Sequence, residues 1–201
     1  PARGRARGGY RAGGNPDPLA TGTAVRVVAR HQGRGVHETP IGFKFLSPLL
    51  ADGRADVAGG SVGDLAFADQ GIDRDPFTAV ALLAELLNTT GRPLGDLLDA
   101  LGDEVGRLQW FESRVPGTGG PDALHATGTK ALARAGLISG SDPSITEIDG
   151  MKFWLDDDQW MLLRPSTTEA GIRIYGEVLS GRDSARRIDR LLTSVRDLLA
   201  P

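Results

Sequence analysis

The hydrophobic positions in the first half of the chain predict short helices that alternate with short strands. Residues 19–32 repeat apolar side chains at helical spacing, and residues 33–43 have the composition of a strand that runs into a turn. A short helix around residues 46–50 and a brief strand over 55–58 follow. Helices that alternate with strands are typical of an α/β layer, in which helices cover a sheet.

The clearest helix of this half covers residues 76–88. Asp75 is a suitable N-cap, Pro76 fits the first helical position, and apolar residues recur at spacings of three and four. A second amphipathic helix follows over residues 94–101, and we expect Gly102 to end it.

The pattern changes after residues 115–121, a Gly- and Pro-rich stretch that we interpret as a linker. A helix over residues 122–135 precedes strand-like runs at 151–155, 159–163 and 172–178. The third run alternates between an apolar set, Ile172, Ile174 and Val178, and a polar set, Arg173, Tyr175 and Glu177. A final amphipathic helix completes the pattern of an α+β module, an antiparallel sheet that buries one face beneath helices.

The composition is that of an ordinary globular protein without a dominant charge. The 201 residues are 40% hydrophobic and 24% charged, and the formal net charge is −3. This balance gives no basic field for nucleic acid, and Glu85 interrupts the longest apolar run, so we expect neither a nucleic-acid partner nor a membrane span. The absence of cysteine removes disulfides, thiolate zinc sites and cysteine nucleophiles. We expect a cytoplasmic protein.

The segment at residues 1–14 is basic, with four arginines and no acidic residue. It lacks the apolar region of a signal peptide and has too few large apolar side chains to order itself, so we expect a flexible tail. An RNA- or phosphate-binding arm is the alternative. We expect the tail to be followed by an α/β domain at 15–114, the linker at 115–121 and an α+β domain at 122–201.

The strongest chemical signal lies between the last two predicted strands. One strand delivers Arg164 to its end and the next begins near Arg173, and in an antiparallel pair these ends are neighbours. Three hydroxyl residues stand between them, Ser166, Thr167 and Thr168. Two guanidinium forks, hydroxyl donors and backbone N–H groups in a tight loop suit a phosphate dianion. The alternative is a solvated hairpin loop whose arginines pair with Glu169 and Glu177.

Residues 164–170 (RPSTTEA) resemble the R-P-S-G-T-E-P phosphate loop in the last domain of the phosphohexose mutases, the phosphoglucomutase/phosphomannomutase family. Residues 38–44 (ETPIGFK) are similar to the family's E-T-x-V-G-F-K segment. Residues 59–64 (GGSVGD) fall at its G-G-E-E-S-G sugar loop, and residues 73–77 (DRDPF) resemble its K-D-G-I segment. With four segments in the right order, the chain resembles the third and fourth domains of the family.

This resemblance implies a partial three-layer α/β domain of the third-domain type, followed by the small C-terminal α+β domain. The segment NPDPLAT is a poor strand, so we expect the first strand of the third domain to be missing. The family's phosphoserine lies in its first domain and its magnesium-binding D-x-D-x-D-R loop in its second, and this chain has neither motif. The resemblance therefore implies no catalytic residue and no cofactor in this chain, with magnesium expected only alongside a separate N-terminal half.

The residues carried over from the family form a phosphate set and a sugar set. The phosphate set is Arg164, Ser166, Thr167, Thr168 and Arg173. The sugar set is Lys44, Ser61 and Asp64. Val62 stands near the position of the family's serine and can neither donate nor accept a hydrogen bond, so we expect phosphate binding to be retained and sugar recognition to be weakened.

Other candidates have simpler interpretations. His31 and His37 flank a turn, and exposed polar positions explain them better than general acid–base catalysis. Residues 156–158 (DDD) fit a solvated turn better than a metal site. Trp154 and Trp160 fit cross-strand packing better than a platform for a sugar ring.

Three functions stay open, and so does the question of whether the chain is an enzyme. The first is the C-terminal half of a phosphohexose mutase, which binds the phosphate of a hexose phosphate while another polypeptide supplies the chemistry of intramolecular phosphoryl transfer. The second is a non-catalytic phosphosugar- or anion-binding relative. The third is a structural remnant without a ligand.

Overall fold

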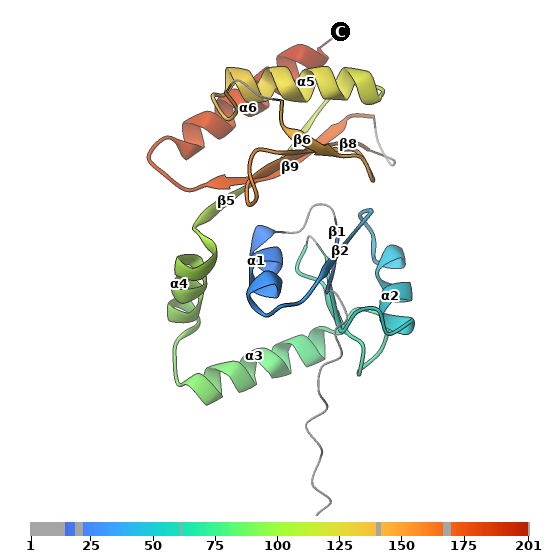
Figure 1. Ribbon diagram of the computed structural model, residues 1–201, viewed down its shortest axis with the longest axis vertical. Helices are drawn as coiled ribbons and strands as arrows, with labels where there is room; N and C mark the ends of the chain where they lie inside the picture. The colour runs from blue at the N-terminus through green and yellow to red at the C-terminus, as the bar shows by residue number, and fades with distance from the viewer. Residues whose placement is uncertain (1–14, 19–21, 61, 140–141, 167–169, 201) are drawn as a thin grey trace, which may run out of the picture.

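The computed structural model describes residues 15–18, 22–60, 62–139, 142–166 and 170–200. They form two units, one above the other in Figure 1: a first unit that contains α1 to α4 and short strands, and a second unit built on a five-stranded sheet. Within these residues, no helix has both the length and the apolar character needed to pass through a bilayer.

The first unit consists of short strands and helices, as the sequence predicts. Its elements are β1 (Asn15–Pro18), α1 (Thr23–His31), β2 (Val36–Thr39), a 3-10 turn (Phe43–Phe45), α2 (Ser47–Ala51), β3 (Val57–Gly59), β4 (Leu65–Phe67), α3 (Pro76–Thr90) and α4 (Leu94–Val105). β1 runs parallel to β2, and β3 pairs with β4 in antiparallel fashion. The core of the unit includes Phe43, Leu46, Leu50, Ala58 and Ala66.

β1 forms although its sequence, NPDP, is a poor strand, so the expected loss of the first strand is wrong. Pro16 and Pro18 are two residues apart, and their missing N–H groups therefore fall on the same edge of the strand. The other edge keeps the N–H groups of Asn15 and Asp17 for pairing with β2.

α3 confirms the predicted helix and extends it to Thr90. The carboxylate of Asp75 accepts the backbone N–H of Thr78 at 3.0 Å, which makes Asp75 the N-cap that the sequence predicts. None of the residues of α3 is buried, and Phe77 is 86% and Val80 66% exposed.

α4 runs through Gly102, where the sequence predicts its end, and stops at Val105. Arg107 folds back over the last turn and donates to Asp99 and Asp103, both at 2.9 Å. The chain leaves the helix at Gly106, whose φ of 88° is open to glycine and strained for other residues.

The second unit is an antiparallel sheet in the order β5–β9–β8–β7–β6 with two helices on one face. Its elements are β5 (Leu108–Val115), α5 (Pro121–Arg134), β6 (Ser144–Thr146), β7 (Met151–Trp154), β8 (Trp160–Pro165), β9 (Ile172–Leu179) and α6 (Ser184–Leu199). α5 and α6 cover the face that points away from the first unit (Figure 1). The predicted apolar set, Ile172, Ile174 and Val178, is buried there with Leu191 and Val195 of α6. The predicted α+β module is confirmed.

β5 belongs to this sheet, which corrects the predicted division of the chain after residue 114. All eight residues of β5 pair with β9. Phe111 and Val115 are buried in the core of the second unit. The stretch at 115–121 therefore connects β5 to α5 inside the second unit, and the chain passes between the units just before β5.

The outer face of the sheet packs against the first unit through polar contacts. At the start of α1, Thr23 donates its N–H to Glu177 at 2.6 Å and its hydroxyl to the carbonyl of Asp158 at 2.8 Å. Lys152 of β7 is fully buried and reaches Glu38 of β2 at 3.1 Å. These contacts fix how the sheet meets the first unit.

Candidate functional site

Arg164 and Arg173 lie on the outer face of the sheet, directly opposite each other. Arg164 is near the end of β8, Arg173 is near the start of β9, and the antiparallel register pairs them. Both line a cavity of about 240 Å³ between the two units. The prediction that these two strand ends are neighbours is confirmed.

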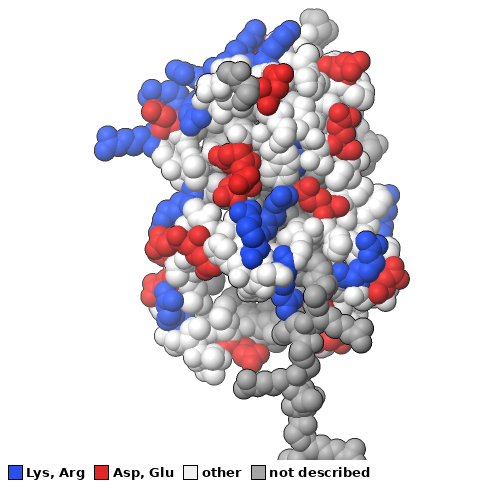
Figure 2. Space-filling view, in the orientation of Figure 1, with Lys and Arg blue, Asp and Glu red and all other residues white. Residues whose placement is uncertain are grey.

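The cavity has one wall from each unit. The wall from the first unit includes Phe43, Val62, Asp64 and Arg74, and the wall from the second adds Glu112 and Tyr175 to the two arginines. Both signs of charge therefore meet in the cavity. Acidic and basic side chains are likewise interspersed over the face of the molecule in Figure 2.

Arg164 is held by one carboxylate. Its Nε donates to Oδ2 of Asp149 at 2.8 Å, and its side chain is only 14% exposed. Because this bond uses Nε, the edge of the guanidinium formed by Nη1 and Nη2 is not taken up by Asp149. The sequence analysis did not single out Asp149, and the available signal was the Asp-Gly pair at 149–150, which is typical of a turn.

Arg173 and Tyr175 lie two residues apart on the same face of β9 and both line the cavity. Hydrogen bonding to the Tyr175 side chain raises the pKa of the Arg173 guanidinium above its ordinary value, and the charge of Glu112 adds to this. Like any arginine, Arg173 is a cation at neutral pH. Glu177, expected in the solvated-loop alternative to pair with the arginines, instead accepts the N–H of Thr23 and the indole N–H of Trp160.

The loop between β8 and β9 is closed at its base. The N–H of Ser166 donates to the carbonyl of Gly171 at 2.9 Å. Gly171 has a φ of 144°, and a Cβ there would lie 2.9 Å from a carbonyl oxygen of β5, so this approach requires glycine. Thr167 and Thr168 of the predicted phosphate set, like Glu169, lie outside the described residues.

Arg114 is a cation that the sequence analysis missed. It stands opposite Arg173, so Arg114, Arg173 and Arg164 form a row across β5, β9 and β8. Its Nη2 donates to the carbonyl of Ala170 at 2.9 Å, at the end of the same loop. It was missed because residues 108–115 were not predicted as a strand: three consecutive polar residues, Glu112, Ser113 and Arg114, precede Val115 and break the alternation.

The loop at residues 59–64 forms part of the first unit's wall. The N–H of Gly60 donates to the carbonyl of Asp64 at 2.7 Å. A Cβ on Gly60 would lie 1.8 Å from Oδ1 of Asp64, so a larger residue here would have to displace the Asp64 carboxylate. Val62 is 86% exposed and lines the cavity, whereas Ser61 of the predicted sugar set lies outside the described residues.

Asp64 lines the cavity, and only one of its two carboxylate oxygens has a hydrogen-bond partner among the described residues. Its Oδ2 accepts Nε of Arg74 at 2.8 Å, and the Arg74 guanidinium lies over the Phe43 ring, 4.5 Å from the centroid. Its Oδ1 is buried and has no hydrogen-bond partner in the described part of the chain. This oxygen is an acceptor without a donor, on a residue that faces the cavity.

Lys44 does not line the cavity, which differs from its expected place in the sugar set. The 3-10 turn buries Phe43 and leaves Lys44 exposed, with Nζ 4.9 Å from the centroid of the Phe45 ring. Neighbouring residues on a tight turn point in different directions, and here Ile41 and Gly42 face the cavity instead.

The histidines and the acidic triplet lie away from the cavity. His31 Nδ1 is 2.9 Å from Oε1 of Glu104 at the surface. Oδ1 of Asp156 accepts the N–H groups of Asp158 and Gln159 at 2.9 and 2.6 Å, as expected for a turn. Among the residues that the structure describes, no three His, Asp or Glu side chains are grouped so as to hold a metal ion.

Trp154 and Trp160 pack across β7 and β8, as predicted, and enclose a lysine. The two residues are register partners, and Nζ of Lys152 lies 4.1 and 4.3 Å from their ring centroids. Glu38, which bonds Lys152, also accepts Nη1 of Arg26 at 2.6 Å. The sequence analysis did not single out Lys152, and the signal was a lone charge within an apolar strand.

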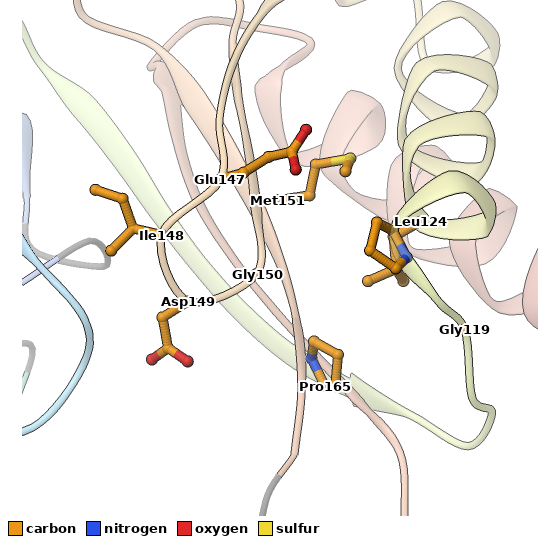
Figure 3. Close-up of a pocket in the computed structure, with 9 residues that line it drawn as sticks. Gly119, Leu124, Glu147, Ile148, Asp149, Gly150, Met151 and Pro165 are labelled. Carbon is orange, nitrogen blue, oxygen red and sulfur yellow. The ribbon is translucent and has the colours of Figure 1, made fainter.

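A second cavity, of about 360 Å³, is lined by the segment that carries Asp149, by the start of α5 and by Pro165. In Figure 3 the carboxylate of Asp149 points away from Leu124 and Met151, which line the same cavity. This orientation agrees with the bond from Asp149 to Arg164.

Comparison with known proteins relates the chain to one group of enzymes. Residues 11–105 match the family model described as phosphoglucomutase/phosphomannomutase, alpha/beta/alpha domain III. A phosphoglucomutase/phosphomannomutase of Thermococcus kodakarensis is 26% identical over 162 residues, which make up 81% of this chain and 33% of the relative. This chain thus spans about a third of the length of the curated relatives that it matches.

Solved structures share the fold. Parafusin, a phosphoglucomutase from Paramecium, has a TM-score of 0.67 at 19% identity, over 92% of this chain and 38% of that chain. An N-acetylphosphoglucosamine mutase from Aspergillus fumigatus, in complex with GlcNAc-6P and magnesium, has a TM-score of 0.60 at 15% identity, over 93% of this chain and 39% of that chain. At these identities the likeness shows the fold alone.

Proposed function

Since the chain is a phosphoglucomutase/phosphomannomutase-like protein that corresponds to the C-terminal part of those enzymes, we propose that it binds the phosphate of a hexose phosphate for intramolecular phosphoryl transfer. One observation carries this proposal: Arg164 and Arg173 stand opposite each other on one cavity. The complex of the Aspergillus relative with GlcNAc-6P supports the choice of a hexose phosphate as ligand.

The electrostatics of the cavity favour an anion between the two arginines. Like charges directly opposite each other on neighbouring strands destabilise a sheet. A phosphate dianion offsets this repulsion, and a guanidinium matches its geometry with paired N–H donors. Arg164 is fixed by Asp149 through Nε, which leaves the Nη1 and Nη2 donors of its guanidinium for a ligand.

In the proposed role the chain positions the substrate and does not carry out the chemical step. Arg164 and Arg173 hold the phosphate that is not transferred, and the sugar lies toward the wall of the cavity that contains Asp64. Correct placement of a reactant contributes much of the rate of phosphoryl transfer. A separate N-terminal half would supply the phosphoserine and the magnesium site. Hexose phosphates are charged and stay in the compartment where they are made, so we place the protein in the cytoplasm.

A second candidate is a binding protein without catalytic activity. Val62 offers no hydrogen bond to a sugar, and Lys44 lies outside the cavity. A site with few sugar contacts binds phosphate and discriminates poorly among hexoses.

Titration calorimetry with glucose 1-phosphate and with inorganic phosphate tests the shared part of both candidates. The protein is expected to bind both, and Arg164→Ala or Arg173→Ala should weaken binding at least about tenfold because a charge-assisted bond is lost. Arg186→Ala is the matched control: it removes one positive charge from α6, where the side chain is 72% exposed. If both cavity variants bind phosphate as tightly as the parent protein, Arg164 and Arg173 do not form the phosphate site and the proposal fails.

A coupled mutase assay separates the two candidates. The chain is mixed with a polypeptide that carries the first two mutase domains, and each component is also assayed alone. Turnover in the mixture only is expected of a mutase half. Phosphate binding without turnover in any mixture is expected of the non-catalytic relative.

A further inference from the structure

One carboxylate oxygen joins the phosphate site to the first unit. Oδ2 of Asp149 accepts Nε of Arg164 at 2.8 Å and the backbone N–H of Ile41 at 3.0 Å. Ile41 lines the cavity from the first unit, and Arg164 lines it from the second. The Asp149 side chain is 25% exposed, so both bonds are partly shielded from water.

The backbone places Asp149 with little freedom. The next residue, Gly150, has a φ of 123°, and a Cβ there would lie 2.5 Å from the carbonyl oxygen of Leu163 and 3.0 Å from Cα of Arg164. Only glycine permits the turn after β6 to come this close to the end of β8. The carboxylate therefore meets Arg164 because the main chain delivers it there, with a short side chain that has few rotamers.

We infer that Asp149 is a positioning residue for the phosphate site. By binding Nε, it holds the long Arg164 side chain in one rotamer with Nη1 and Nη2 left for the ligand. By accepting the N–H of Ile41, it also fixes the position of the opposite cavity wall relative to Arg164. Asp149 is not among the residues that line the 240 Å³ cavity, so it would act on the phosphate through Arg164. This inference rests on the proposed function and adds to it the residue that orients Arg164.

Removing the charge of Asp149 should change the affinity for phosphate in opposite directions, depending on whether Asp149 positions Arg164 or acts only through its negative charge. A negative charge close to an anion site repels the anion, so removing it should strengthen phosphate binding if charge alone matters. If Asp149 positions Arg164, removing its charge should weaken binding. Asp149→Asn tests this because asparagine has the same size and its oxygen can accept both N–H groups, so the substitution removes only the charge that strengthens the bond to Arg164.

The experiment measures the affinity for inorganic phosphate by calorimetry in the full chain. Asp149→Asn is expected to bind about tenfold more weakly, because the charge-assisted bond that holds Arg164 becomes a neutral one of about half the strength. Glu147→Gln is the matched control, since it removes a charge two residues away on the same segment and Glu147 is exposed. The control is expected to bind as tightly as the parent or slightly more tightly. Equal or tighter binding by Asp149→Asn overturns the inference.

A double substitution shows whether Asp149 acts through Arg164. In an Arg164→Lys background the partner nitrogen Nε is gone, so Asp149→Asn should change the affinity no further; an undiminished tenfold loss there overturns the inference. Should Asp149→Asn fail to unfold cooperatively, Asp149→Ser replaces it, with the same weakening expected. If the parent protein does not bind phosphate, the proposed function fails. If the parent binds, Arg164→Ala does not, and Asp149→Asn binds normally, only the inference about Asp149 fails.

Discussion

Arg164 and Arg173 stand in direct register on β8 and β9, so two positive charges share one face of the sheet at the edge of one cavity. Arg114 extends this row onto β5. A sheet tolerates such a row where an anion is bound or where each charge has a partner. If phosphate binds between Arg164 and Arg173 as proposed, it should therefore also stabilise the second unit.

Inorganic phosphate should raise the melting temperature of the protein. A ligand that binds only the folded state at one hundred times its Kd adds about 2.7 kcal/mol to the free energy of unfolding. This corresponds to a shift of several degrees for a chain of this size. Differential scanning calorimetry with and without phosphate measures it. The same ionic strength of sodium chloride is the control, and Arg164→Ala should show no shift beyond that of chloride.

Glu38→Gln should destabilise the protein strongly because it leaves the buried ammonium group of Lys152 without its carboxylate. Breaking a buried pair from one side costs about 3–5 kcal/mol, and we expect the lower end because Glu38 is 18% exposed. Urea unfolding followed by tryptophan fluorescence measures the loss. Lys152→Met combined with Glu38→Gln should recover most of it, and a double variant no more stable than the single one would contradict this account.

Gly128→Ala should destabilise the second unit although alanine favours helices. A Cβ at residue 128 of α5 would lie 2.1 Å from the ring of Phe153, which is fully buried and has no room to move. The cost of such overpacking is about 1–3 kcal/mol. Gly95→Ala on α4 is the control, because a Cβ there meets nothing within 4 Å. It should stabilise the protein by about 0.5–1 kcal/mol, and opposite signs in urea unfolding are the test.

Acid should loosen the first turn of α3. The hydrogen bonds from Thr78 hold the pKa of Asp75 below its ordinary value of 3.8. A group whose pKa is lower in the folded state stabilises that state above its unfolded pKa, and the contribution is lost as the pH falls through the folded value. The protection factor of the Thr78 amide, measured by NMR hydrogen exchange and corrected for the intrinsic rate at each pH, should therefore decrease as the pH falls below the ordinary pKa of an aspartate. Asp75→Asn should abolish this pH dependence, and an unchanged profile would show that another group is responsible.

Local patterns predicted the parts of the fold that depend on short-range order. The alternation of β9 placed Arg173, Tyr175 and Glu177 on one face, and that face meets the first unit. Because residues at alternate positions of a strand point the same way, the pattern alone separated the core side from the side of the cavity. The N-cap of α3 followed from Asp75 and Pro76 for the same local reason.

Contacts between distant segments were not predictable from spacing. Asp149 and Ile41 are 108 positions apart, and no periodicity connects them. Arg74 lies in a segment that was noted for its likeness to a known family, but its bond to Asp64 depends on how two loops fold back. Lys44 was expected in the cavity by analogy, and the turn at Phe43–Phe45 directs it elsewhere.

The exposed hydrophobic side chains of α3 have a practical consequence for the behaviour of the protein in solution. Its fifteen residues include Phe77, Val80 and Leu86, exposed by 86%, 66% and 46%. An exposed hydrophobic surface of this kind favours self-association. Dilute solutions should therefore show strong fluorescence with a hydrophobic dye, and concentrated solutions should show increased light scattering. Replacing Phe77 and Val80 by glutamine should reduce this light scattering and leave the arginines that face the cavity unchanged.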